Sequence, residues 1–148
     1  MKVLVGIAES QESAIVLSAL KRFPWPAATE FRVLCVAEKV HPSMLELMGS
    51  SVQGVQQRAD FHASTTASEA AAELRDAGLT VEAETREGDP KVEIIEHGKQ
   101  WGADLIVVGS EVDGRLRRVL LGSVATAVVK NAACSVLVIR ADPERVHE

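Results

Sequence analysis

The stretch 103–124 constrains the fold of this chain more strongly than any other. Its apolar run, residues 105–108, is rich in β-branched side chains and too short for an ordinary helix. The run therefore predicts a strand buried on both faces, as in a parallel sheet under helices. It ends at Gly109-Ser110, and a helical apolar pattern begins at Gly122-Ser123 after a charged loop. Strand, glycine-bearing loop and helix in this order are typical of anion and nucleotide sites, because free amides at the helix start point into the loop.

The rest of the chain alternates between strand and helix patterns. Apolar or alternating runs predict four more strands, at 2–7, 31–36, 79–85 and 135–139. Helical spacing predicts four helices, at 10–21 with Ser10 as N-cap, 55–77, 90–101 and 123–131. This alternation implies an α/β three-layer sandwich, with a five-stranded parallel sheet and helices on both faces. We expect a single domain, 1–148, whose tail at 141–148 is frayed.

The order of the strands follows from their apolarity. Strands 2–7 and 105–108 are the most apolar and are expected at the centre, whereas 79–85 alternates in a way typical of an edge. The order 3-2-1-4-5 satisfies both conditions. Ligands of such sheets bind beyond the carboxyl ends of the strands, at the switch point between the first and fourth strands. Gly109 and Ser110 are therefore candidate site residues.

Local signals define the helix at 90–101. Asp89 is suited to be its N-cap and Pro90 its first residue, and Gly102 ends it. Gly98 replaces a better helix former at a cost of about 1 kcal/mol, which suggests close backbone packing. The buried face is expected to consist of Val92, Ile95, Gly98 and Trp101. The core face of the helix at 123–131 is expected to consist of Val124, Ala125, Val128 and Val129.

The least regular section is 37–54. It combines Pro42, Gly49 and Gly54 with several large apolar side chains. Two interpretations remain open from sequence: a flap or partner contact, or a short helical turn tucked on the core.

Composition excludes several classes of function. The net charge is −5, there is no basic stripe and only 3% of residues are aromatic, so nucleic-acid binding is not expected. No apolar stretch approaches the roughly 20 residues that span a bilayer, so no membrane association is expected. The four histidines lack metal-site spacing, and no metal site is predicted. Cys35 and Cys134 indicate a cytoplasmic protein with two buried, reduced thiols, although sequence alone leaves a bridge open.

Four stretches together resemble the universal stress protein family over nearly the whole chain. They are residues 3–7 with Ser10, Gly88-Asp89-Pro90, residues 103–110, and residues 116–124 followed by 136–139. The resemblance implies the sandwich described above, commonly as a homodimer that pairs the last strand, here 136–139, across a two-fold axis. Protection of that edge by the tail is the alternative.

The resemblance also implies a binding loop for ATP or another adenine nucleotide, of the form Gly-x2-Gly-x9-Gly-Ser/Thr. Gly109, Gly122 and Ser123 fall in register, but Val112 stands at the second glycine. Ala8 stands where nucleotide-binding relatives carry an acid. Losing one charge-assisted hydrogen bond removes about 1.5–3 kcal/mol. The phosphate end is expected at the amides of Gly122, Ser123 and Val124, and the base end at Val36.

Two hypotheses of function follow. The first is a cytosolic stress-response regulatory module with a degenerate ATP-binding loop, which takes Mg²⁺ only together with a nucleotide. The second is a nucleotide-free homodimer that acts through protein contacts. No residue is placed to activate a serine nucleophile, so we expect no enzyme and no catalytic residue. The arginines at 115, 117 and 118 suit either a polyphosphate or, more in keeping with the nearby acids, a solvated helix start.

Overall fold

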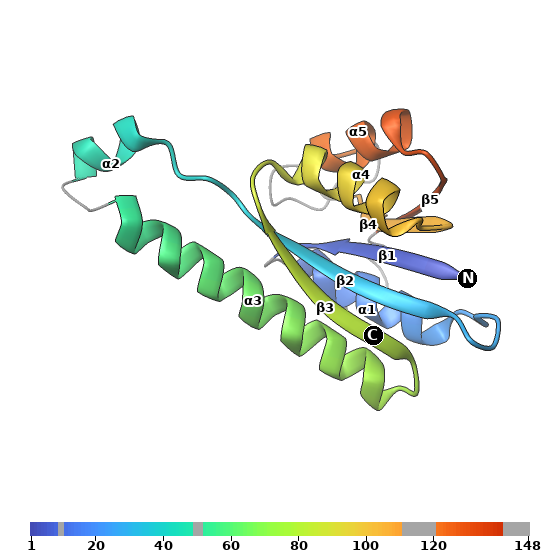
Figure 1. The fold of residues 1–148 in the computed structure, drawn as a ribbon. Coiled ribbons are helices and arrows are strands. Elements are labelled where there is room, and N and C mark those ends of the chain that lie inside the picture. Colours follow the sequence, from blue (N-terminus) through green and yellow to red (C-terminus); the bar gives the residue numbers. More distant parts are fainter. Residues whose placement is uncertain (9–10, 49–51, 111–120, 141–148) are drawn as a thin grey trace.

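The computed structural model describes residues 1–8, 11–48, 52–110 and 121–140. Its sheet has five parallel strands in the order β3-β2-β1-β4-β5, which confirms the expected topology (Figure 1). The strands are β1 (Lys2–Ile7), β2 (Glu30–Ala37), β3 (Thr80–Glu87), β4 (Leu105–Gly109) and β5 (Ser135–Ile139). The predicted Ser10 cap, the charged loop at 111–120 and the tail at 141–148 lie outside the described residues.

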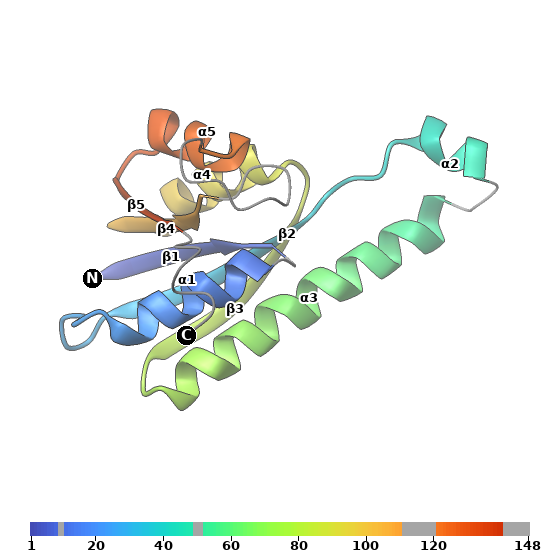
Figure 2. The same cartoon turned by 180° about the vertical axis from the view of Figure 1, so that it is seen from behind.

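Helices cover both faces of the sheet. They are α1 (Gln11–Arg22), α2 (Pro42–Met48), α3 (Val52–Asp76), α4 (Pro90–Trp101) and α5 (Ser123–Asn131). Figures 1 and 2 show α1 and α3 on one face and α4 and α5 on the other. The described part of the chain thus has five helices where the sequence predicted four, because α2 forms inside the irregular section. No described helix combines the length and apolarity needed to cross a bilayer.

The core consists of two apolar layers, one on each face of the sheet. Strand alternation sends Val3 and Val5 of β1 toward α1 and α3, and Leu4 toward α4 and α5. All three side chains are completely buried. Burial of each such side chain stabilises the fold by about 1.5–3 kcal/mol, so the central strands hold both layers together.

The strand register sets the position of the carboxyl edge. Pairing of β1 with β2 ends at Ile7 and Cys35. Pairing of β2 with β3 continues to Ala37 and Glu87. The end of β2 therefore extends past the end of β1. It lies beside the switch point, where the chain that follows β1 and the chain that follows β4 go to opposite faces of the sheet.

The section 37–54 does not form the helical turn tucked on the core that one of its two interpretations expected. It contains a helix, α2, but this helix is not tucked on the core. It stands away from the body together with the start of α3, and Leu47 on it is 89% exposed (Figure 1). The reason is the length of α3, whose 25 residues begin well before the helix reaches the sheet. We call α2 and residues 52–58 of α3 the arm.

Helix α4 begins and ends as predicted, but its buried face is rotated from the expected one. The Asp89 carboxylate accepts the Lys91 amide at 3.0 Å, and Gly102 ends the helix at φ 75°. Val92 was wrongly placed, since it is 53% exposed. The buried positions are Ile94, His97 and Gly98. The pattern of apolar residues did not predict this face, because one of its buried positions is occupied by a polar residue, His97.

Close packing at Gly98 is confirmed. A Cβ atom there would lie 2.9 Å from Cδ1 of Ile106 on β4. The predicted core face of α5 is also wrong in part. Ala125 and Val128 are buried as expected, whereas Val129 is 50% exposed. Val129 lies next to Val128 on the helix, and adjacent residues face directions about 100° apart.

Asp104 and the two cysteines are not among the predicted site residues. The Asp104 carboxylate accepts the Lys2 amide at 2.7 Å, and its own amide donates to the Lys2 carbonyl at 2.8 Å. Asp104 is therefore a structural group at the amino end of β4, far from the switch point. Neither cysteine forms a disulfide, but Cys134 is only half-buried, contrary to expectation. Partial burial still raises the pKa of the Cys134 thiol.

Candidate ligand-binding site

A cavity of about 680 Å³ lies at the carboxyl edge of the sheet. It has the size of pockets that hold drug-sized ligands. The end of β1, the end of β2 and the start of α5 all contribute to its lining. The cavity therefore occupies the switch point that the topology predicts.

The cavity continues over the edge of the sheet from one face to the other. Its two walls belong to the two apolar layers of the core. The wall on the α4 and α5 side is formed by Gly6, Val36, Pro90, Ile94, Val108, Ser123 and Val124. The opposite wall is formed by Ser13, Val16, Cys35, Ala37, Ala59, His62, Ala63 and Thr66, with Ile7, Ala8, Glu38, Val40 and Gly109 completing the lining.

Four of the six predicted site residues line this cavity: Val36, Gly109, Ser123 and Val124. Ala8, the position of the missing acid, lines it as well. Ser110 and Gly122 are not part of the lining. They bind to each other instead, because the Gly122 amide donates to the Ser110 carbonyl at 3.2 Å, and Ser110 is buried. Their contact connects the end of β4 to the start of α5.

The start of α5 presents backbone donors. Gly122 is its N-cap and has no side chain to satisfy the first turn. The helical ladder begins with the Thr126 amide, which donates to the Gly122 carbonyl at 2.9 Å. The amides of Ser123 and Val124 are therefore first-turn donors without a helical acceptor, and both residues line the cavity. Such a helix start attracts anions through its amides and its dipole.

The end of β2 presents a backbone acceptor. The Ala37 carbonyl accepts the Gly88 amide at 2.9 Å, on the β3 side of the strand. Successive carbonyls of a strand point to opposite sides, so the Val36 carbonyl faces the β1 side. That position is one residue beyond the last β1–β2 pair, Ile7 and Cys35. An acceptor here suits an amino group at the edge of a planar base.

One wall of the cavity, contributed by α3, was not predicted from the sequence. Ala59, His62, Ala63 and Thr66 line the cavity from this helix. Their spacing of three, four and seven residues shows that they share one helix face, which the sequence does reveal. It does not reveal which turn of a 25-residue helix reaches the carboxyl edge of the sheet.

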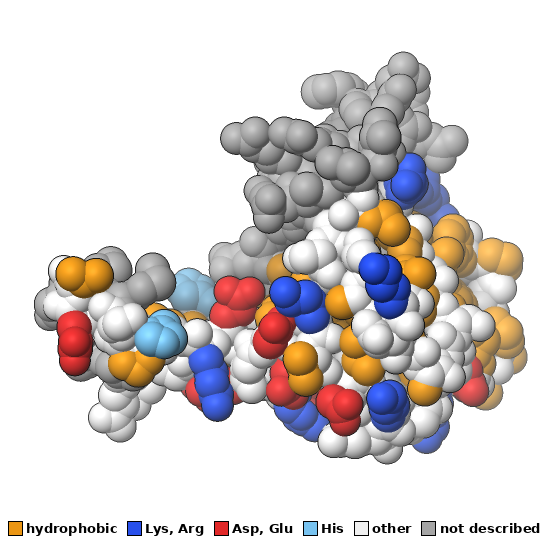
Figure 3. Space-filling view, turned by 90° about the horizontal axis from the view of Figure 1, so that it is seen from above, with side chains coloured by type: hydrophobic (Ala, Val, Ile, Leu, Met, Phe, Trp, Pro, Cys, Tyr) orange, Lys and Arg blue, Asp and Glu red, His pale blue; other side chains and the backbone are white. Residues whose placement is uncertain are grey.

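The ionisable groups of the described lining are few. They are Glu38, His62 and the Cys35 thiol, and no lysine or arginine belongs to that lining. The three loop arginines at 115, 117 and 118 lie outside the described residues, as does Val112. Among the described residues, no three histidine, cysteine or carboxylate side chains form a group that would hold a metal ion. Figure 3 shows basic and acidic side chains interspersed on the visible face of the body, with the arm projecting beside it.

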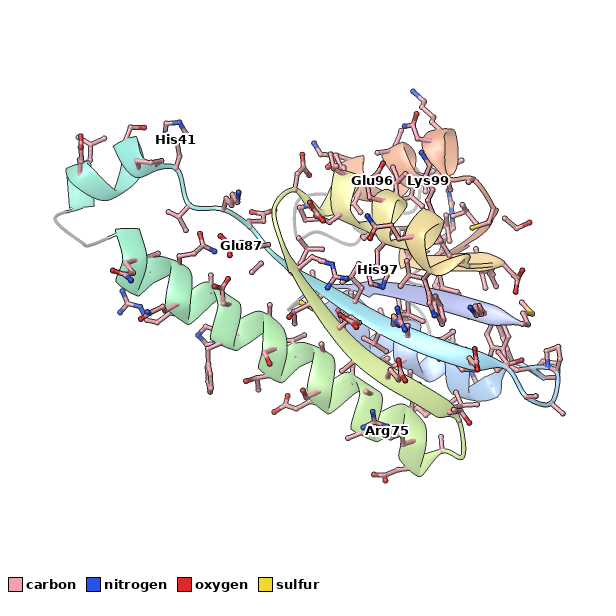
Figure 4. The ribbon with its side chains drawn as sticks, in the orientation of Figure 1. His41, Arg75, Glu87, Glu96, His97 and Lys99 are labelled. Atoms are coloured by element: carbon pink, nitrogen blue, oxygen red, sulfur yellow. The ribbon has the colours of Figure 1, made fainter. Side chains whose placement is uncertain are left out.

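His97 is a buried ionisable group that lies away from the cavity, on the side of α4 that faces the sheet (Figure 4). Its Nε2 lies 3.3 Å from Nη1 of Arg32, which can only donate, so Nε2 accepts and the neutral ring carries its proton on Nδ1. Arg32 also contacts Glu82 at 3.1 Å and the Trp101 ring at 4.5 Å. Burial lowers the pKa of His97, and the positive charges of Arg86 and Arg32 lower it further, against Glu84.

This shift predicts acid sensitivity. The unfolded chain, with an ordinary histidine pKa near 6.5, binds a proton before the folded protein does, so stability should fall as the pH drops below about 6.5. We expect the urea midpoint to decrease from pH 7.5 to pH 5.5, and to decrease less in His97→Gln. His41→Gln removes an exposed histidine and serves as the control. Equal pH slopes in wild type and His97→Gln would contradict the assignment.

Comparisons with known proteins agree with this geometry. Residues 1–140 match the profile of the universal stress protein family. The universal stress protein YxiE of Bacillus subtilis is 30% identical over 148 residues, which cover 94% of this chain and 98% of that protein. The universal stress protein MJ0531 of Methanocaldococcus jannaschii is 48% identical over 63 residues, which cover 43% of this chain and 37% of that longer protein.

Solved structures show the same fold. The M. jannaschii protein MJ0577 superposes with a TM-score of 0.81 at 26% identity, over 96% of both chains. A universal stress protein in complex with cAMP superposes with a TM-score of 0.62 at 21% identity, over 95% of this chain and 96% of that one. One from Archaeoglobus fulgidus in complex with dAMP superposes with a TM-score of 0.63 at 18% identity, over 95% and 98%.

Proposed function

The chain belongs to the universal stress protein family, and from this premise we propose that it is a regulatory protein that binds an adenine nucleotide, ATP or a relative of it, at the carboxyl edge of its sheet. The base lies against Val36 and the phosphates lie at the start of α5. The observation that carries the proposal is that these two features open onto one cavity of about 680 Å³.

Each end of the cavity suits one end of a nucleotide. The uncapped amides of Ser123 and Val124 and the Ser123 hydroxyl offer donors to phosphate oxygens. The Val36 carbonyl offers an acceptor to the exocyclic amine of adenine. The side chains of Ile94 and Val108 add an apolar surface for the ring. The cAMP and dAMP complexes of the structural relatives support adenine as the base.

Two residues limit the affinity that we propose. Ala8 lines the cavity but supplies no carboxylate, and Val112 replaces a glycine of the loop. Either change removes about one interaction, so binding should be weaker than in a relative that retains both features, by roughly ten- to a hundredfold per lost charge-assisted bond. We propose that Mg²⁺ binds only together with the phosphates of a bound nucleotide.

Thermal unfolding tests the proposal. A ligand at about 100 times its dissociation constant stabilises the folded state by roughly 2.7 kcal/mol, so millimolar ATP with Mg²⁺ should raise Tm by several degrees. Nucleotide released from the purified, denatured protein should be adenine-containing. Magnesium tripolyphosphate at the same concentration controls for salt and for binding of the phosphates alone. The proposal fails if ATP causes no shift and no nucleotide is released.

A second candidate function is a nucleotide-free homodimer that acts through protein contacts. The exposed Leu47 on the arm and the open edge at β5 favour it. Under this alternative, Ala8→Asp combined with Val112→Gly should create ATP binding that the parent lacks. Strong binding by the parent excludes it.

The proposal extends to the oligomer, the location and the absence of catalysis. We propose a homodimer paired through β5, whose side chains from Val136 to Val138 are only half-buried in one copy. A cytoplasmic location accords with two cysteines that form no disulfide. The Ser13 hydroxyl donates to the Ala8 carbonyl, and no hydrogen bond connects a described serine of the lining to His62, so a regulatory role fits better than hydrolysis.

A further inference from the structure

We infer that Glu38 reads the ribose hydroxyls of the bound nucleotide, and that Gln56 on α3 holds it in position. The inference rests on the proposed nucleotide site. It assigns a specificity-determining carboxylate and a positioning residue that the loop motif does not contain.

Glu38 is placed at the base end of the cavity. It is the one aspartate or glutamate in the described lining. It follows Val36 by two residues, just beyond the last residue of β2, and both Val36 and Glu38 line the cavity. Ala37 between them belongs to the opposite layer of the core. Glu38 is exposed, and no described cation forms an ion pair with its carboxylate.

Gln56 fastens the segment that carries this carboxylate. Its Oε1 accepts the Val40 amide at 3.2 Å, and its Nε2 donates to the Glu38 carbonyl at 3.4 Å. The same Nε2 donates to Asp60 Oδ1 at 3.1 Å, one turn along α3. The Gln56 amide thus connects the chain after β2 to α3 on both sides of residue 39. Because both partners are backbone groups, the contact sets the path of the segment rather than one side chain.

The segment that Gln56 holds, residues 38–40, lies between two cavities. Glu38 and Val40 line the ligand cavity. Lys39, Val40, Gln56 and Glu87 line a second cavity, of about 420 Å³, behind the segment. Figure 4 shows Glu87 at the end of β3, beside this segment. Release of the Gln56 contact would let the wall move toward either cavity, and Glu38 would move with it.

A carboxylate suits the ribose and not the phosphates. Its two oxygens accept hydrogen bonds from the adjacent 2′ and 3′ hydroxyls, which donate. An acid in a comparable place, after the second strand of a parallel sheet, contacts the ribose in dinucleotide-binding folds. The same negative charge repels phosphate groups. Glu38 and the amides of α5 therefore orient the nucleotide from opposite ends of the cavity.

Binding of ATP and of 2′-deoxy-ATP, measured by calorimetry with Mg²⁺, tests the assignment. Wild type should prefer ATP by roughly ten- to a hundredfold, the effect of one charge-assisted hydrogen bond. Glu38→Gln should weaken ATP by a similar factor and bring the preference close to one. Glu87→Gln, which removes an acid that lines the other cavity, should retain the preference. Equal preference in wild type and Glu38→Gln would overturn the role of Glu38.

A pair of neighbouring variants tests the positioning role. Gln56→Ala should reduce the preference for ATP over its 2′-deoxy form, whereas the exposed Gln57→Ala should not. A merely structural glutamine would change Tm and leave the preference intact, and that result would overturn the role of Gln56. Binding of both nucleotides without any preference in wild type overturns only this inference. Absence of ATP binding in wild type, together with no nucleotide released from the denatured protein, overturns the proposed function as well.

Discussion

Ser123→Asp is expected to weaken ATP binding by about thirtyfold or more while leaving the fold as stable as before, or more stable. The carboxylate would stand in the first turn of α5, where this structure places the amides that face the cavity. Two like charges about 4 Å apart repel by roughly 4 kcal/mol at an effective dielectric constant near 20. If salt halves this, about 2 kcal/mol remains, which still corresponds to roughly thirtyfold.

Ser123→Asp should lower the affinity for ATP without lowering the stability of the fold, so a loss of binding cannot be attributed to misfolding. An acid in the first turn of a helix interacts favourably with the helix dipole and contributes about 0.3–1 kcal/mol. Tm of the nucleotide-free variant should therefore stay equal or rise. Adenosine, which lacks phosphates, should bind wild type and variant equally, and Ser123→Ala should fall between them for ATP. If Ser123→Asp weakens adenosine as much as ATP, the phosphates do not lie at the start of α5.

Val138→Pro is expected to convert the proposed dimer into a folded monomer. The Ile139 carbonyl accepts the Ser110 amide at 3.1 Å on the β4 side, so the amide of Val138 points to the open edge of the sheet. Proline removes this donor and fills its place with a ring. An unsatisfied partner group costs about 1–3 kcal/mol, and two-fold symmetry doubles the loss to about 2–6 kcal/mol.

Light scattering after size exclusion measures the outcome. Wild type at micromolar concentration should have about twice the chain mass of 15.9 kDa, and Val138→Pro should have the single-chain mass with an unchanged circular dichroism spectrum. Leu137→Pro is the matched control. Its amide faces β4, so this variant should lose stability instead of only losing its partner. A monomeric wild type would refute pairing through β5.

The sequence predicted the sheet well because its signals are local. The last strand agrees with the prediction at both ends, Ser135 and Ile139, since an apolar run and a polar flank define it. The bounds of α4 were equally accessible, because Asp89 and Gly102 act on their own backbone. The central position of β1 was predictable as well, because its apolar run indicates a strand that is buried on both faces.

The errors arose where a residue's environment is set by distant parts of the chain. His97 is buried against the sheet, where Arg32 of β2, 65 residues earlier, contacts it from the same face. Val92 and Val129 are exposed although they are apolar, because neither faces a packed layer. No helical period distinguishes these cases, since the period gives a face and not the surface that covers it.

The candidate site was predictable in part for the same reason. Ser123 and Val36 were found because a loop motif and a strand end mark them. Glu38 and His62 were missed, although both line the cavity. Their contribution depends on how far α3 extends past the sheet and on the contact between Gln56 and the segment after β2, which are tertiary facts.

The length of α3 gives this helix two halves of unequal local stability. At 1.5 Å per residue its 25 residues span about 37 Å, whereas the eight residues of β2 span about 26 Å. From Ala63 to Leu74 the helix is anchored by buried side chains, but residues 53–58 have no fully buried side chain. Amide hydrogens before Ala59 should therefore exchange with solvent through local fraying, while those near Ala71 exchange only through global unfolding. The ligand cavity lies at this boundary, so an occupant that contacts His62 and Thr66 would extend the cooperative unit by about two turns.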